Sequence, residues 1–293
     1  MSLRVACIGE AMIELSMQGD AAGVGVAGDS LNTAIYLKRV APDIQVDYIT
    51  RLGVDALSDR IHDFAASQGI GTSAITRDPN GTPGLYAISL REDGERSFTY
   101  WRSAAAARGM FGDGDFSGLD DYDLIYLSGI SLAILPAQVR ADLLAHIATS
   151  GIRMAFDSNY RPKLWEDAET ARAMCRAFFE RCDIALPSID DEMALFEETE
   201  DQVTARCTGM RATGALKRGA QGPLGLGEDV TQTYDPAAKV VDTTAAGDSF
   251  NGAYLGALLA GKTQAEALLA GHNMAATVVQ HRGAIIPADA GPV

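Results

Sequence analysis

Short apolar runs alternate with helical segments along most of the chain, and this alternation constrains the fold more than any other feature. Apolar runs of this length are typical of strands in a parallel sheet, because helices bury both of its faces. We therefore predict an α/β fold with a central, mostly parallel sheet and helices on both faces. The predicted strands are residues 5–9, 46–50, 124–128, 154–157, 184–187 and 215–217.

Helix-boundary signals lie between these strands. Residues 29–40 have a helical pattern. A second helix is predicted to run from an N-cap at Asp55 to Gly69, because aspartate favours the start of a helix and glycine the position after its end. Further helices are predicted to begin near Pro136, Trp165, Asp190 and Asp201.

One region departs from this alternation and predicts a second, smaller sheet. The β-type runs 84–91 and 96–102 flank Glu92-Asp93-Gly94-Glu95, and Asp-Gly between two such runs is a strong hairpin signal. Residues 12–17 are a third candidate strand. The alternative is an antiparallel extension of the main sheet. We expect one domain over residues 1–293, with a β-sheet lid formed by about residues 10–18 and 82–103.

The chain is strongly acidic, with 24 Lys and Arg against 39 Asp and Glu and a formal net charge of −15. A field of this sign repels nucleic acid and anionic membranes, so neither is an expected partner. No apolar stretch is long enough to span a membrane, and the first one is too short for a signal peptide. The four cysteines show no metal-binding spacing and are expected to be reduced thiols of a cytoplasmic protein.

Two glycine-rich segments match nucleotide-binding patterns, but their surroundings do not fit. Residues 256–263 match the P-loop pattern, yet they begin inside a predicted helix, residues 247–260, whereas a P-loop follows a strand. Residues 23–28 match G-x-G-x-x-G but do not come directly off the first strand. These glycines could instead let a sugar approach the backbone next to Asp29 and Asn32.

Residues 240–250 carry the strongest chemical signal. A short apolar strand is predicted to lead into a long helix, whose first-turn amides at Ala245, Ala246 and Gly247 have no acceptors within the helix. The positive end of the helix dipole and the small side chains predict a phosphate site. Asp248 beside it suits a base that takes a proton during phosphoryl transfer. The alternative is an aspartate that only stabilises the helix.

Residues 242–252, Asp-Thr-Thr-Ala-Ala-Gly-Asp-Ser-Phe-Asn-Gly, resemble the C-terminal signature of the ribokinase-like (PfkB-type) carbohydrate kinases. The resemblance extends over nearly the whole chain. It includes the sugar-binding segment at 28–34, the nucleotide turn at 216–222, the helix flanking adenine at 271–276 and the terminal turn at 283–287. It implies a ribokinase-like α/β fold with a β-sheet lid, ATP and Mg²⁺ as cofactors, and a homodimer formed through the lid.

Three segments, residues 100–102, 157–165 and 187–192, are most similar to family members that act on 2-keto-3-deoxygluconate. This resemblance implies ATP-dependent phosphorylation of that sugar acid to its 6-phosphate. Arginine has a planar fork that suits a carboxylate, so Arg102 and Arg161 are candidates to hold the acid. The alternatives are a kinase of a neutral sugar (fructose, ribose or a nucleoside) and a non-catalytic sugar-acid sensor.

The resemblance also implies a role for each site residue. The catalytic group is Asp248 with the amides of Ala245, Ala246 and Gly247. The substrate-binding residues are Gly28, Asp29, Asn32, Tyr86, Tyr100, Arg102, Asn159, Arg161 and Asp248. The nucleotide-binding residues are Ser188, Lys217, Gly219, Gly222, Ala246, Gly247 and Asn273.

Two carboxylates are candidate metal ligands. Many family members carry Asn-x-x-Glu where this chain has Ser188-x-x-Asp191, so Asp191, or the neighbouring Glu192, is the candidate to organise Mg²⁺ through water. Asp242 and Thr243 are either capping residues or ligands of a monovalent cation such as K⁺.

Overall fold

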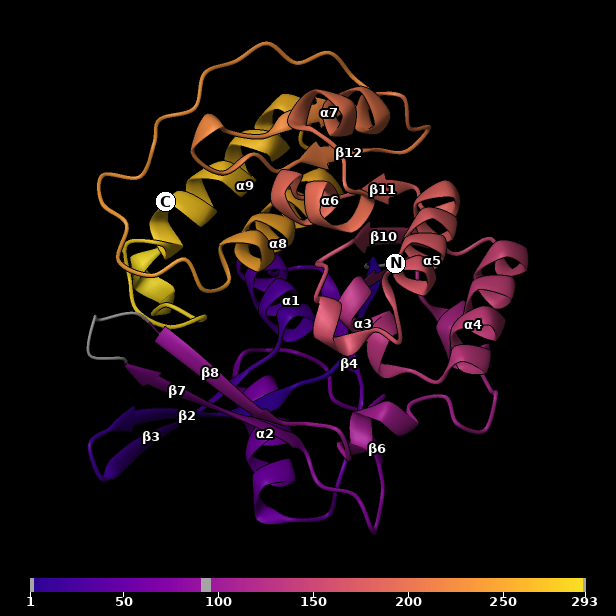
Figure 1. Cartoon of the computed structure of the whole chain (residues 1–293), viewed down its shortest axis with the longest axis vertical. Coiled ribbons are helices and arrows are strands. Elements are labelled where there is room, and N and C mark those ends of the chain that lie inside the picture. The colour runs from indigo at the N-terminus through magenta and orange to yellow at the C-terminus, as the bar shows by residue number, and fades with distance from the viewer. Residues whose placement is uncertain (1–2, 91–95, 292–293) are drawn as a thin grey trace.

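The computed structural model describes residues 3–90 and 96–291. A seven-stranded sheet forms the centre of the molecule (Figure 1). The strand order is β13-β12-β11-β10-β9-β1-β4, and every neighbouring pair is parallel except β12 with β13. The strands are β1 (Arg4–Ile8), β4 (Gln45–Ile49), β9 (Leu124–Ser128), β10 (Arg153–Asp157), β11 (Ile184–Ala185), β12 (Thr213–Leu216) and β13 (Leu224–Leu226). The chain passes from β1 to β4 on one side and returns to β9 on the other. Ligands of such sheets bind outside the carboxyl ends of the strands near this reversal.

Helices cover both faces of this sheet, which confirms the predicted architecture. Ala6 and Ile8 of β1 belong to one core, whereas Val5 and Cys7 belong to the other, because successive side chains of a strand point to opposite faces. The first face carries α3 (Gly129–Ile134), α4 (Ala137–Ser150), α5 (Ala168–Arg181), α6 (Ile189–Phe196) and α7 (Glu200–Thr208). The second carries α1 (Asp29–Val40), α2 (Ala56–Ser67), α8 (Ala246–Leu259) and α9 (Gln264–Val278).

The seven-stranded sheet and the helices that cover it are called the body below. A separate four-stranded sheet, called the second sheet, extends to one side of the body (Figure 1). Its order is β3-β2-β7-β8, formed by β2 (Met12–Gln18), β3 (Ala21–Ala27), β7 (Gly84–Leu90) and β8 (Arg96–Trp101). β2 runs parallel to β7, and the two outer pairs are antiparallel. The predicted strands in this region therefore do not extend the main sheet. The predicted turn at Glu92-Asp93-Gly94-Glu95 lies outside the described residues.

Short elements complete the fold. β5 (Arg51–Leu52) and β6 (Thr76–Arg77) form a two-stranded sheet. Short 3₁₀ turns occur at Ala106–Gly109, Ser117–Asp121, Pro162–Leu164, Gly219–Gln221 and Ala288–Ala290. Across residues 3–90 and 96–291, the structure has no helix that is both long and apolar enough to span a membrane.

The predicted boundaries at Asp55, Gly69, Gly261 and Thr263 are confirmed, whereas the helix predicted to begin near Trp165 begins at Ala168. The Asp55 carboxylate accepts hydrogen bonds from the amides of Leu57 (2.9 Å) and Ser58 (3.1 Å), and Gly69 follows α2 with a φ of 75°. Gly261 follows α8 with a φ of 83°, and the side chain of Thr263 caps α9. The segment that matches a P-loop is therefore the junction of two helices.

One strand prediction is wrong, and four of the described strands, β3, β5, β6 and β13, were not predicted. Residues 240–241 form no strand: Val240 and Val241 are 66% and 43% exposed, and the chain there is irregular. Their valine content indicated a strand, but no neighbouring strand pairs with them in the part of the chain that the structure describes. The glycine-rich residues 21–27 form β3, whose glycines hid the strand pattern.

Candidate active site

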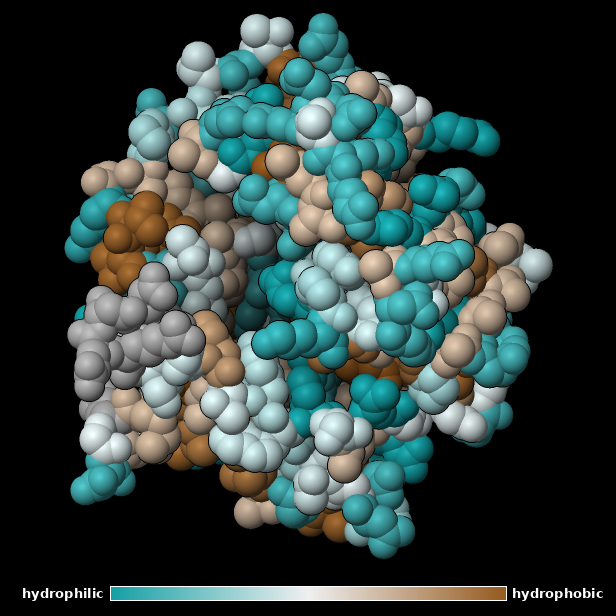
Figure 2. Space-filling model, viewed as in Figure 1, coloured by the Kyte–Doolittle hydropathy of each residue, from teal (hydrophilic) through white to brown (hydrophobic). Residues whose placement is uncertain are grey.

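A cleft of about 1270 Å³ opens at the carboxyl ends of the parallel strands, where the two sheets face each other. The surface of the molecule is visibly hollowed there (Figure 2). The body contributes residues that directly follow its strands and the start of α8, and the second sheet contributes the aromatic side chains of Tyr86, Phe98 and Tyr100. The volume exceeds that of a typical pocket for one small molecule, so two ligands have room to bind side by side.

The N-terminus of α8 opens into this cleft. Ala245 precedes the helix with a φ of 60°, a left-handed conformation that is uncommon for a residue other than glycine. The amide of Ala246, one of the three predicted anion donors, already donates to the Thr243 carbonyl at 3.2 Å. The amides of Ala245 and Gly247 have no acceptor among the residues that the structure describes. These two amides are left to bind an anion.

Asp248 lies in the first turn of α8 and lines the cleft. Asn32 of α1 donates from Nδ2 to Oδ2 of Asp248 at 2.8 Å, and Thr33 donates to its backbone carbonyl at 3.3 Å. Burial first, and then the negative charge of Asp29, raise the pKa of Asp248 to about 7. A carboxylate with a pKa near neutrality is suited to accept a proton.

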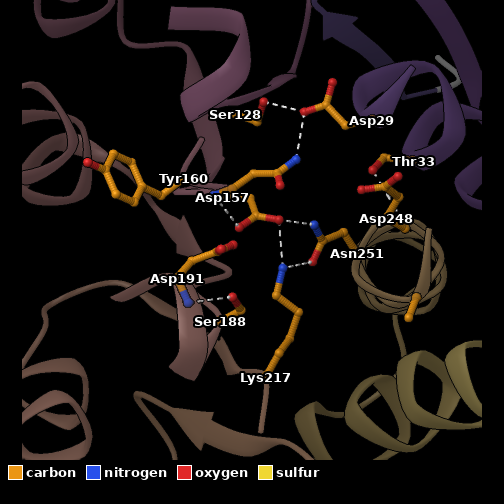
Figure 3. Close-up of polar contacts among 12 residues, drawn as sticks. Asp29, Thr33, Ser128, Asp157, Tyr160, Ser188, Asp191, Lys217, Asp248 and Asn251 are labelled. Atoms are coloured by element: carbon orange, nitrogen blue, oxygen red, sulfur yellow. Dashed lines mark hydrogen bonds and ion pairs between the residues drawn. The ribbon is translucent and has the colours of Figure 1, made fainter. Parts of the chain in front are cut away.

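A buried ion pair joins the ends of β10 and β12 (Figure 3). Lys217 Nζ is 2.6 Å from Asp157 Oδ2 and 3.1 Å from Asn251 Oδ1. Asn251 Nδ2 donates to the same oxygen of Asp157 at 2.7 Å, and the Asn159 amide donates to the other at 3.1 Å. These contacts tie two strand ends to α8, directly beside the anion donors.

Asp29 opens α1 near the same strand ends. Ser128 Oγ donates to its Oδ2 at 2.5 Å (Figure 3). Asn159 Nδ2 donates to the same oxygen at 2.9 Å. Gly28 precedes it, and a Cβ there would lie 2.3 Å from the Glu10 carbonyl oxygen, so this backbone approach requires glycine. Of the glycines in residues 23–28, Gly28 lines the cleft and the two within β3 do not.

The second sheet supplies aromatic rings and an arginine. The ring centroids of Tyr86 and Tyr100 are 5.6 Å apart, and the Tyr86 hydroxyl donates to the Glu14 carboxylate. Arg102 forms an ion pair with Glu10, whose side chain is buried. Burial raises the pKa of Glu10, although the Arg102 charge acts in the opposite direction. A protein carboxylate therefore already holds Arg102 at the wall of the cleft.

The opposite wall carries the candidate magnesium residues. Arg161 Nη1 is 3.2 Å from Asp191 Oδ1, and burial raises the pKa of Asp191. Ser188 lines the cleft and caps α6, accepting from the Asp191 amide at 3.4 Å. Glu192, the alternative, is buried 3.0 Å from Arg206 and does not line the cleft.

The described residues contain no cluster of three or more His, Cys, Asp or Glu side chains that could hold a metal ion. Mg²⁺ usually keeps several waters and binds through one or two carboxylates and the phosphates of its ligand. Asp191, which lines the cleft, fits that requirement.

Three of the predicted site residues do not line the cleft. Gly222 has a φ of 80°, and a Cβ there would lie 2.3 Å from the Tyr234 ring, so the turn geometry accounts for this glycine. Asn273 is exposed on α9, next to His272, which does line the cleft. Asp242 accepts hydrogen bonds from Thr244 and from the amide of Gly283, and so links two loops.

Sequence reasoning missed Glu10, Asp157 and Asn251 as site residues. Glu10 and Asp157 each lie at or just beyond the carboxyl end of a predicted strand, and this position was the available signal. Asn251 gave no such signal, because it is a helix residue whose partners lie 34 and 94 positions away in the sequence.

A carboxylate with a raised pKa beside free helix amides, in a cleft outside a doubly wound parallel sheet, is an arrangement suited to small-molecule kinases. The model of the pfkB family carbohydrate kinases matches residues 2–290, and the chain belongs to this family.

Among curated relatives, the chain is 43% identical to 2-dehydro-3-deoxygluconokinase of Dickeya dadantii over 304 residues, covering 98% of each chain. It is 41% identical to the protein of the same name from Escherichia coli over 309 residues, covering 100% of each. Among solved structures, a PfkB protein from Polaromonas sp. JS666 is similar with a TM-score of 0.82 and 26% identity, covering 96% of each chain. A fructokinase from Xylella fastidiosa, solved with bound ATP, shares the fold with a TM-score of 0.81 at 22% identity, covering 99% of this chain and 95% of its own.

Proposed function

We propose that this protein transfers the γ-phosphate of ATP to the 6-hydroxyl of 2-keto-3-deoxygluconate (2-dehydro-3-deoxy-D-gluconate), with Asp248 as the general base. The observation that carries the proposal is the placement of the Asp248 carboxylate, whose pKa is raised to about 7, beside the unbonded amides of Ala245 and Gly247. The similarity to relatives named 2-dehydro-3-deoxygluconokinase supports the choice of sugar acid.

Asp248 accepts the proton of the attacking hydroxyl as the new bond to phosphorus forms. The carboxylate must be ionised to do so, and a pKa of about 7 leaves a substantial ionised fraction at neutral pH while keeping the group basic. The hydrogen bond from Asn32 holds the carboxylate in place. The amides of Ala245 and Gly247 stabilise the charge that develops on the transferring group.

The sugar acid binds between the body and the second sheet, which acts as a lid that excludes water. Its carboxylate is recognised by Arg102 and Arg161, both of which line the cleft. Tyr86 and Tyr100 cover the carbon chain from the sheet. Asn32 Oδ1 is buried and has no hydrogen-bond partner in the described structure, so a sugar hydroxyl would satisfy this acceptor. Gly28, Asp29 and Asn159 complete this part of the site.

ATP occupies the other end of the cleft, along Ser188, Lys217 and Gly219, all of which line it. His272 and Ala275 of α9 line the cleft as well and take the place beside the nucleotide that we had expected for Asn273. Mg²⁺, when bound, supplies positive charge that offsets the phosphates, and Asp191 is the residue that would hold it.

The test is release of ADP by the purified protein with Mg·ATP, comparing 2-keto-3-deoxygluconate with gluconate, fructose and ribose. Selective turnover of the keto-deoxy acid is the expected result. Turnover of only a neutral sugar would retain the kinase and reject the acid-binding role of the arginines, which the double variant Arg102→Gln/Arg161→Gln checks directly. No turnover of any sugar would favour the non-catalytic sensor.

The second sheet is also the surface through which we expect two copies of the chain to associate. Met17, Val24 and Trp101 lie in this sheet and are 38%, 42% and 57% exposed. A measurement of mass in solution, by light scattering, should give twice the chain mass, and a monomer would reject this expectation.

A further inference from the structure

Lys217 lines the cleft beside the proposed nucleotide site, and its ammonium group lies near the start of α8. Its Nζ lies 3.6 Å from the position that a Cβ on Gly247 would occupy. Because bonds at Cα are about 1.5 Å long, Nζ and the Gly247 amide nitrogen are within about 6 Å of each other. A phosphate group, which carries several oxygens, can accept hydrogen bonds of about 2.9 Å from both groups across that span.

The hydrogen bonds of Lys217 use two of the three N–H donors of its ammonium group. An ammonium carries three N–H groups, and Asp157 and Asn251 accept two of them. The third has no acceptor among the described residues of the protein. The Lys217 side chain is only 10% exposed, so bulk water reaches this donor poorly, and the cleft that it lines is where an acceptor would come from.

We propose that Lys217 is a catalytic residue that contacts the γ-phosphate of ATP during its transfer. Asp157 and Asn251 are positioning residues that fix its ammonium beside the amide of Gly247. The inference rests on the proposed function and adds to it an assignment for one residue: Lys217 serves the transferring phosphate specifically and not the nucleotide as a whole.

Each group has a separate role in the proposed reaction. The sugar hydroxyl oxygen forms a bond to the γ-phosphorus, and the bond from that phosphorus to the bridging oxygen of ADP breaks. ADP leaves with the electron pair of that bond, and the hydroxyl proton goes to Asp248. Lys217 exchanges no proton and stabilises the negative charge on the oxygens of the group in flight.

The surroundings of Lys217 fix its position before any ligand binds. Asp157 is buried, and Asn251 holds it from α8 while also donating to the Tyr126 hydroxyl at 3.2 Å. Burial of Asp157 and Asn251 means that neither can turn toward solvent. The ammonium therefore needs little reorganisation when the phosphate arrives, which is the condition under which such a charge is most effective.

The experiment compares two nucleotides that differ in the γ-phosphate. Affinities of wild type and Lys217→Met are measured for Mg·ADP and for a β,γ-imido analogue of Mg·ATP, together with kcat for 2-keto-3-deoxygluconate. We expect Lys217→Met to bind the analogue about 10–100-fold more weakly, as for loss of a hydrogen bond to a charged group. Its affinity for ADP should change by less than about threefold, and kcat should fall by roughly 10²–10³-fold, as for loss of a preorganised donor.

Two further variants keep the result interpretable. Lys217→Met leaves Asp157 as an unpaired buried carboxylate, so the double variant Lys217→Met/Asp157→Asn removes both charges and should show the same selective loss for the analogue. Lys262→Met is the matched control: it removes one ammonium from a side chain that is 58% exposed and 3.9 Å from Glu266, and both affinities should stay unchanged.

Equal weakening of ADP and the analogue would overturn the proposal, because Lys217 would then serve the α- or β-phosphate. Unchanged affinities with unchanged kcat would also overturn it and leave Lys217 as a structural partner of Asp157. If the wild type neither binds a nucleotide nor releases ADP, the proposed function fails with it. If the wild type is active and Lys217→Met has the same ratio of affinities for the analogue and for ADP as the wild type, only the role assigned to Lys217 fails.

Discussion

The two sheets of the molecule line the same cleft with different kinds of groups. The body presents side chains that hold one another, such as Lys217 with Asp157 and Asn251, at the ends of strands covered on both faces. The four-stranded sheet presents aromatic residues that are partly open to solvent: Phe98 and Tyr100 are 43% and 51% exposed. We infer that the body fixes the groups that act on the phosphate, and that the second sheet selects the sugar.

The most direct test of this comparison is to alter Asp248, the proposed base in the body. Asp248→Asn should lower kcat by about 10²–10⁴-fold, the usual contribution of a general base, with little change in KM for the sugar acid. Steady-state kinetics with an ADP-coupled assay measures both constants. Near-normal turnover would remove Asp248 from the role of base.

A change in the second sheet should alter KM for the sugar acid and not kcat. Arg102→Gln should raise KM for the sugar acid about 10–100-fold, through loss of a charged hydrogen bond, and leave KM for ATP unchanged. Because this variant also leaves Glu10 buried without its ion-pair partner, Glu10→Gln/Arg102→Gln is the matched control for stability. An effect mainly on kcat would contradict the division of roles between the two sheets.

The pH dependence of kcat/KM should arise from Asp248 in the body and not from a residue of the second sheet. The pKa of Asp248 is raised to about 7, and its ionised form is the proposed base, so kcat/KM should fall about tenfold per pH unit as the pH drops below about 7. The pH–rate profile of Arg102→Gln should keep this inflection, and the residual rate of Asp248→Asn should lose it. An inflection that survives in Asp248→Asn would assign the titration to another group.

The smallest effects concern the packing of the two regions. A Cβ on Gly252 of α8 would lie 2.5 Å from the Thr33 carbonyl oxygen and 2.7 Å from Tyr36 Cβ on α1, so Gly252→Ala should destabilise the fold by about 1–3 kcal/mol. In β3, a Cβ on Gly23 would meet its nearest atom at 3.8 Å, and Gly23→Ala should cost no stability. Urea unfolding of the two variants makes the comparison, and equal losses would contradict it.

The sequence predicted the body better than the second sheet for a physical reason. A strand with two buried faces must be apolar throughout, and the predicted strands 5–9, 124–128 and 154–157 lie within one residue of β1, β9 and β10. β3 has exposed residues over most of its length and contains two glycines, so nothing in its composition required a strand.

The same distinction applies to the site. The helix start at residues 245–248 is a local feature, and local sequence was enough to predict that free amides and the Asp248 carboxylate lie together there. The pairing of Glu10 with Arg102 joins residues 92 positions apart, and that of Asn251 with Asp157 joins residues 94 positions apart. Such contacts depend on the strand order, which periodicity alone does not specify.

The close contact of α1 and α8 around Gly252 also bears on how this protein could be engineered. Asn32 and Asp248 lie on these two helices, and the close backbone contact at Gly252 holds together the helices that carry their hydrogen bond. Libraries that randomise Tyr86, Phe98, Tyr100 and Arg102 would therefore search for new acceptors while keeping the two helices that carry the proposed base, Asp248. Directed evolution of substrate range has a defined and separable target in this molecule.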